Sequence, residues 1–181
     1  MTFCQILSKR LALVLGIAAT ISAAVPAVQA QTPAQSAEDQ QLEKLLTGAE
    51  LFFKKGFNEQ AQRWEYQVAW SQNGETSLIT LYVRELATSG DGKRVCVAYG
   101  WTQVIGMPQG QDLPPAVIKA VASVNGNLFT GNVSAEGGGV FANTGMVMKD
   151  LTADSLWIYL WDLHDTRTVL KKEFEKLLAG G

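Results

Sequence analysis

The stretch Arg63-Trp-Glu-Tyr-Gln-Val-Ala-Trp70 places a bulky apolar side chain at every second residue and mostly polar side chains between them. A two-residue period is that of a β-strand with one buried face. Asn73-Gly74 follows, and this dipeptide favours the tight turn of a β-hairpin. The stretch therefore predicts a strand that turns back into a second, antiparallel strand.

The segments after this turn continue the same alternation. Residues 78–86 predict the second strand, and Ser89-Gly-Asp-Gly92 predicts another turn. In the third strand, residues 95–102, one face carries only the small side chains of Cys96, Ala98, Gly100 and Thr102. Such a face admits a helix or another backbone segment at close range.

A helix is predicted on the amino-terminal side of these strands. Ser36-Ala-Glu-Asp39 resembles a capping box, in which a hydroxyl and a carboxylate satisfy the first backbone groups of a helix. Apolar residues then recur at steps of three and four residues up to Phe53, and Lys54-Lys55-Gly56 suits a helix end. We expect one helix over residues 36–55.

The carboxyl-terminal half predicts four more elements. Pro114-Pro115 opens a short helix that ends near Val124. Strands are expected at 128–135 and 140–148, with Gly137-Gly138-Gly139 as the turn between them. From Thr152, a helix cap, leucines keep helical spacing to residue 178. The order α-βββ-α-ββ-α predicts an α+β fold with an antiparallel sheet of about five strands.

The first thirty residues have the three-part pattern of a secretory signal. Lys9 and Arg10 precede an uncharged run of 14 residues (11–24), and Val28-Gln29-Ala30 suits a signal peptidase. The run is shorter than the roughly 20 residues that span a bilayer. We expect cleavage after Ala30, a periplasmic or secreted product without stable membrane insertion, a disordered leader at 31–37, and a folded domain at 38–178.

Cleavage leaves a mildly acidic chain with one cysteine. Removing Lys9 and Arg10 from 15 basic residues leaves 13 against 17 acidic ones, a formal charge of −4. This balance argues against nucleic acid as a partner. Cys4 leaves with the signal, so Cys96 is either buried and free or cross-links two chains.

The sequence offers no convincing constellation for catalysis, metal or cofactor. His164, the single histidine, has Leu160 and Thr168 four residues away, and these are not metal ligands. We expect His164 to be a partly exposed helix residue. A Ser-His-Asp triad is not excluded by composition, but no Gly-x-Ser-x-Gly elbow is present. A non-enzymatic protein is the favoured interpretation.

One segment of the predicted last helix carries more apolar side chains than packing against a core requires. Leu156-Trp-Ile-Tyr-Leu-Trp161 is apolar around nearly the whole helix circumference, whereas a surface helix needs one stripe. Trp157, Tyr159 and Trp161 are therefore candidate partner-binding residues, with core burial as the alternative. Trp64 and Trp70 face the same choice, and for them the alternation favours the core.

Residues 38–178 resemble the YbjN family, described as bacterial sensory transduction regulators, in the order of their elements and in several short sequence motifs. The motifs are Gly56-Phe57, Trp64 before Asn73-Gly74, the small-faced third strand, Val124-Asn-Gly-Asn-Leu128, Gly131-Asn-Val133 and Leu151-Thr-Ala-Asp-Ser-Leu156. The resemblance implies a fold like that of type III secretion chaperones, a homodimer, and binding of a partner polypeptide without covalent chemistry.

Two functions are consistent with these observations. The first is an exported, chaperone-like protein-interaction module that uses aromatic surface. The second is a periplasmic domain that senses a small ligand or lipid in a cavity between the sheet and the last helix. An exposed apolar strip would favour the first function, and an enclosed cavity would favour the second.

Overall fold

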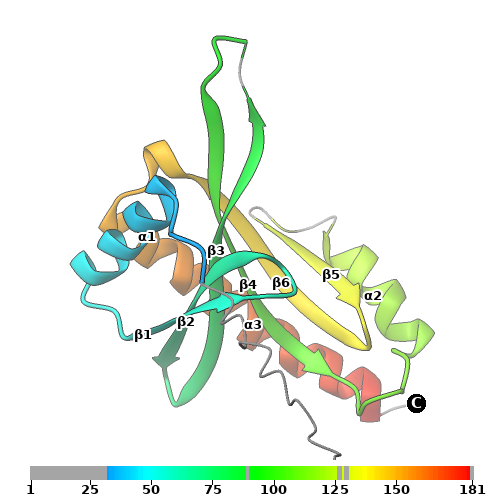
Figure 1. Cartoon of the computed structure of the whole chain (residues 1–181). Coiled ribbons are helices and arrows are strands. Elements are labelled where there is room, and N and C mark those ends of the chain that lie inside the picture. Colours follow the sequence, from blue (N-terminus) through cyan, green and yellow to red (C-terminus); the bar gives the residue numbers. More distant parts are fainter. Residues whose placement is uncertain (1–31, 89, 126–127, 129–130, 180–181) are drawn as a thin grey trace, which may run out of the picture. The chain divides into compact units, whose positions relative to one another are not determined.

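The computed structural model describes residues 32–88, 90–125, 128 and 131–179. The expected signal segment, residues 1–30, lies outside this part of the chain. The elements run, in chain order, α1 (Ala37–Gly48), β1 (Phe53–Asn58), β2 (Arg63–Gln72), β3 (Glu75–Thr88), β4 (Arg94–Gly106), α2 (Pro115–Asn125), β5 (Asn132–Glu136), β6 (Gly139–Val147), the 3-10 turn η1 (Met148–Asp150) and α3 (Ala153–Ala179) (Figure 1).

The strands form one antiparallel sheet in the order β1-β2-β3-β4-β6-β5. The α+β prediction is confirmed, with six strands in the described chain in place of about five. Helix α3 lies across β3, β4 and β6, and it contacts both α1 and α2. The three helices therefore form one layer against the sheet, and the core lies between the two layers.

The first predicted hairpin is confirmed. Asn73 and Gly74 have φ angles of 50° and 80°, the left-handed pair that a two-residue hairpin turn needs. On β2, Tyr66, Val68 and Trp70 are buried, as their alternation predicts. Trp70 is thus core, whereas Trp64 is half-buried beneath Lys55 and next to Phe57.

The small-faced strand also behaves as predicted, because α3 lies directly on it. A Cβ atom at Gly100 would come within 2.7 Å of Leu81 Cδ2 and 2.8 Å of the Tyr159 hydroxyl. Cys96 is buried, as the first of its two expected states requires. The absence of a side chain at Gly100 is what lets Tyr159 and Leu163 reach the sheet.

The predicted first helix is wrong in its second half. α1 ends at Gly48, and residues 53–58 pair with β2 as strand β1. The helix closes with Glu50 at φ 55°, with the Leu51 N–H donating to Leu46 O (3.1 Å) and the Glu50 N–H to Thr47 O (3.0 Å). This is a Schellman motif, and it ends a helix wherever the chain adopts it. Phe52, which lies within the helix expected at residues 36–55, is 92% exposed.

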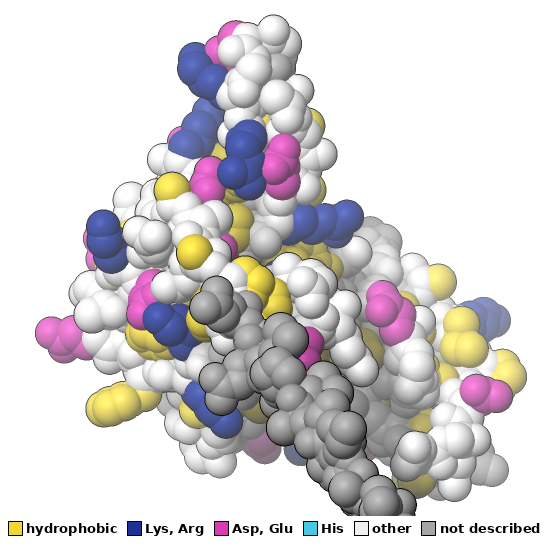
Figure 2. Space-filling view, in the orientation of Figure 1, with side chains coloured by type: hydrophobic (Ala, Val, Ile, Leu, Met, Phe, Trp, Pro, Cys, Tyr) yellow, Lys and Arg dark blue, Asp and Glu magenta, His cyan; other side chains and the backbone are white. Residues whose placement is uncertain are grey.

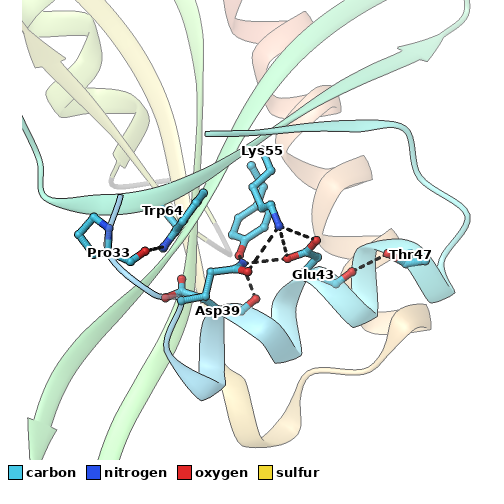
Figure 3. A network of polar contacts seen from close by, with 8 residues as sticks. Pro33, Asp39, Glu43, Thr47, Lys55 and Trp64 are labelled. Atoms are coloured by element: carbon cyan, nitrogen blue, oxygen red, sulfur yellow. Dashed lines mark hydrogen bonds and ion pairs between the residues drawn. The ribbon is translucent and has the colours of Figure 1, made fainter. Parts of the chain in front are cut away.

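The predicted disordered leader is wrong for residues 32–37. Trp64 Nε1 donates to the carbonyl of Pro33 at 3.2 Å (Figure 3). Gln35 Nε2 donates to both Tyr66 Oη (2.7 Å) and Glu43 (2.8 Å). Ala37 is already helical. The capping box is confirmed, since Ser36 Oγ accepts from the Asp39 N–H (3.0 Å) and Asp39 accepts from the Ser36 N–H (3.1 Å). The leader is held by Glu43 of α1, the helix that follows it directly, and by Trp64 and Tyr66 of β2, which lie 31 residues further along the chain than their partners.

The remaining boundaries shift by a few residues. Gly137 and Gly138 form the predicted turn with φ angles of 52° and 77°. The strand expected at 128–135 is β5 over residues 132–136, and residues 129–130 lie outside the described chain. In α2, Val117 and Val121 are buried, whereas Ile118 is exposed.

Candidate interaction surface on the last helix

The first turns of α3 expose three large apolar side chains, which we call the aromatic patch: Trp157 (50% exposed), Ile158 (66%) and Trp161 (42%). Leu156, Leu160 and Leu163 occupy the opposite stripe and are buried against the sheet. A surface helix normally carries one apolar stripe, so this second stripe exceeds the needs of the core. Large exposed apolar side chains that adjoin one another are typical of interaction sites.

The patch is attached to the core through one ring contact. Trp157 meets the buried ring of Trp70 edge-on, with 4.3 Å between centroids and 70° between planes. This contact orients the outer tryptophan, and aromatic pairs of this kind contribute about 0.5–1.5 kcal/mol. The indole Nε1 of Trp70 is itself buried without a hydrogen-bond partner in the described chain. Trp157 is therefore held in a defined position at the surface.

Tyr159, the third predicted contact residue, lies on the wrong side of the helix for this role. It is buried, and its hydroxyl lies 2.8 Å from Thr144 O and 3.1 Å from Ala98 O on two different strands. Burial raises the pKa of Tyr159 far above its ordinary value, so the phenol stays neutral and can donate. Tyr159 anchors α3 to β4 and β6, and we remove it from the candidate surface.

Ile158 replaces it, and helical spacing could have identified this residue. Ile158 lies three residues before Trp161, on the same face, whereas Tyr159 lies three after Leu156 and four before Leu163. The same rule that groups the two tryptophans thus assigns Tyr159 to the core stripe. The prediction ranked residues by aromaticity and so passed over an aliphatic neighbour.

The expectation for His164 is also wrong, because the ring is 4% exposed. Its Nδ1 lies 2.7 Å from Ser77 Oγ on β3, and Ser77 is fully buried. Burial, and next the charge of Arg167, lower the pKa of His164 from its ordinary value of 6.5, so the ring is neutral near pH 7. We assign the Nε2–H tautomer, in which Nδ1 accepts from the Ser77 hydroxyl.

This Ser-His pair suits structure better than catalysis. A nucleophilic serine must reach its substrate, whereas the Ser77 oxygen has no exposed surface. The pair joins α3 to the β2–β3 hairpin. No group of three or more potential metal-ligating side chains occurs among the described residues.

Charge is distributed unevenly along α3. Residues 153–166 carry Asp154, Asp162 and Asp165 and no lysine or arginine, a formal charge of −3. Residues 167–179 carry four basic side chains and two glutamates, a formal charge of +2. The aromatic patch lies in the acidic half, and Val169, which is 55% exposed, lies in the basic half. The side chains of α3 therefore carry net negative charge in its first half and net positive charge in its second half, and exposed apolar residues occur in both halves.

The cavity expected between the sheet and the last helix takes a different form. A hollow of about 460 Å³ lies between the end of β4 and the second half of α3, and Arg167, Lys171 and Glu175 are among its lining residues. In the first half of α3, Tyr159 and Leu163 fill the space above Gly100. A hollow lined by these charged side chains is unlike the mostly apolar pockets that enclose lipids.

Comparisons with known proteins do not assign the chain to a family. No protein-family model matches the chain, and a search of curated proteins finds no match either. Among the described helices, none is both long enough and apolar enough to cross a membrane.

Proposed function

We propose that the chain is an exported, non-enzymatic protein-interaction module that works as a homodimer joined through α3. The observation that carries this proposal is the aromatic patch, which the domain exposes although its core is complete without it. Tryptophan is enriched at the centres of protein interfaces. The proposal agrees with the YbjN-like resemblance, which implies a chaperone-like dimer that binds a partner polypeptide.

The charge pattern of α3 favours a second copy as the occupant of the patch. In a two-fold dimer the same surface meets itself, and two α3 helices can then pack parallel or antiparallel. The antiparallel arrangement is favoured here because it places the acidic half of each helix against the basic half of the other. A two-fold axis near Asp165 sets Trp161 opposite the partner's Val169 and Asp154 opposite the partner's Lys176. The acidic half of each helix then faces the basic half of the other, along a seam of roughly 40 Å.

Light scattering on residues 31–181 across micromolar concentrations tests this proposal. The double variant W157Q/W161Q should weaken association, because central aromatic residues contribute about 2 kcal/mol or more each, roughly thirtyfold in Kd. The matched control is L86Q/I118Q, which alters two exposed apolar residues outside α3 and should leave the dimer intact.

Thermal unfolding of both variants separates interface from core. We expect W157Q/W161Q to remain folded, losing mainly the Trp70 ring contact. A wild-type chain that stays monomeric at every concentration would refute the proposal. Equal weakening by the control pair would show that the effect is not specific to the patch.

A further inference from the structure

A second hollow, of about 710 Å³, lies between the start of α1, the turn end of the β3–β4 hairpin and the η1 turn. Its size is in the range of sites for small organic molecules. The elements that form it are brought together only by the fold, because α1 and η1 are about a hundred residues apart. Gln41 of α1 donates to the carbonyl of Met148 in η1 at 3.2 Å, which closes one side of the hollow.

The floor of this hollow is apolar. Cys96 and Met148 line it and are buried, with Val95 and Val147 beside them. Burial raises the pKa of the Cys96 thiol, with the nearby carboxylate of Glu38 as the next cause, so the thiol is neutral. A neutral thiol, a thioether and two valines together suit the hydrocarbon part of a ligand.

The rim carries charge of both signs, and the hairpin above it shows basic and acidic side chains next to one another (Figure 2). Arg94 is held firmly on one side, since its Nε lies 2.7 Å from Glu85. Its Nη1 is only loosely paired, at 3.8 Å from Glu38. A guanidinium whose outer nitrogens are loosely paired can bind a carboxylate with charge-assisted hydrogen bonds. The neighbouring carboxylates of Glu38 and Asp150 disfavour a ligand with more than one negative charge.

We infer that this hollow binds a small monocarboxylate with a medium-length apolar tail. The tail lies on Cys96 and Met148, and the carboxylate takes the Nη1 side of Arg94. This site is separate from α3 and does not depend on the proposed dimer.

Calorimetric titration of residues 31–181 with octanoate, and with octanol as the uncharged analogue, tests the inference. Octanoate should bind more tightly than octanol. The variant R94Q should lose this preference, with octanoate affinity falling roughly tenfold or more, because a charge-assisted contact is lost. The matched control K44Q removes an exposed cation of α1 that does not line the hollow and should bind octanoate as the wild type does.

Cys96 reports the location of the ligand, since it is the only cysteine in residues 31–181. Octanoate at ten times its Kd should slow alkylation of the thiol about tenfold by mass action. Absence of octanoate binding to the wild type would overturn the inference. So would equal affinity for octanoate and octanol, or an R94Q variant that behaves like K44Q. Light scattering on R94Q should show unchanged association, which keeps this test independent of the dimer.

Discussion

His164 shows how one buried side chain couples the last helix to the sheet. Its ring accepts from Ser77 across 87 residues of sequence, in a buried site. The groups that influence its charge are Arg167 and Asp165 on α3, Glu75 on β3 and the backbone of Gln72. Protonation would convert Nδ1 from an acceptor to a donor and would place a cation beside Arg167.

Stability should therefore decrease in mild acid. The folded state lowers the pKa of His164, so below the ordinary value of 6.5 the unfolded chain binds more protons than the folded chain. Protonation of His164 therefore has no effect on the free energy of unfolding well above pH 6.5, and it decreases that free energy as the pH falls below 6.5. Urea unfolding at about pH 7.5 and about pH 5 should show a decrease that is larger for the wild type than for H164N.

Asparagine is the suitable replacement because its carbonyl oxygen can still accept from Ser77 but does not titrate in this range. Equal pH dependence in the wild type and in H164N would contradict the role given to the histidine.

At the scale of elements, α3 carries both the core stripe and the proposed dimer seam. An axis near Asp165 brings the two Asp165 carboxylates together, whereas Asp154 faces the partner's Lys176. The proposed geometry therefore predicts effects of opposite sign for two similar substitutions on the same face of one helix.

D165N should tighten the dimer, by up to about fivefold, because it removes a like-charge pair worth at most about 1 kcal/mol at an exposed site. D154N should weaken the dimer by up to roughly thirtyfold, because two-fold symmetry makes the pair with Lys176 occur twice and each pair is worth at most about 1 kcal/mol. Sedimentation equilibrium measures both values of Kd. Shifts in the same direction would contradict the antiparallel arrangement even if the dimer itself exists.

Asn125 illustrates a different role at this scale. Its side chain donates to Val133 O (2.7 Å) and accepts from the Val133 N–H (2.6 Å). β5 is an outer strand of the sheet, and outer strands expose backbone groups that can pair with other chains. The asparagine that ends α2 thus satisfies both backbone groups of Val133 on β5.

At the scale of the whole molecule, export remains a proposal that the first thirty residues support. Mass spectrometry of the protein recovered from the periplasm should give the mass of residues 31–181, with Gln31 as the first residue. A chain that keeps residues 1–30 and stays with the membrane would contradict cleavage after Ala30.

The folded part of that chain begins earlier than residue 38, because Pro33 and Gln35 bond to Trp64 and Tyr66. Export with cleavage after Ala30 therefore leaves only a short segment ahead of the first residues bonded to the domain.

The sequence by itself determined those features that depend on local periodicity and turn chemistry. These include the alternating strand at 63–70, the Asn73-Gly74 turn, the small face around Gly100 and the leucine stripe of the last helix. Each results from a repeat or a backbone preference within one element, so no distant partner is needed to recognise it.

Only the tertiary structure decided two other features: residues 53–58 are a strand, and His164 is buried. Residues 53–58 gain their backbone hydrogen bonds from β2, and that gain outweighs a helical pattern. His164 is covered because Ser77 of β3 packs against it, and no residue near His164 in the sequence indicates that contact. The packing of elements distant in sequence sets these outcomes, and local patterns carry no record of it.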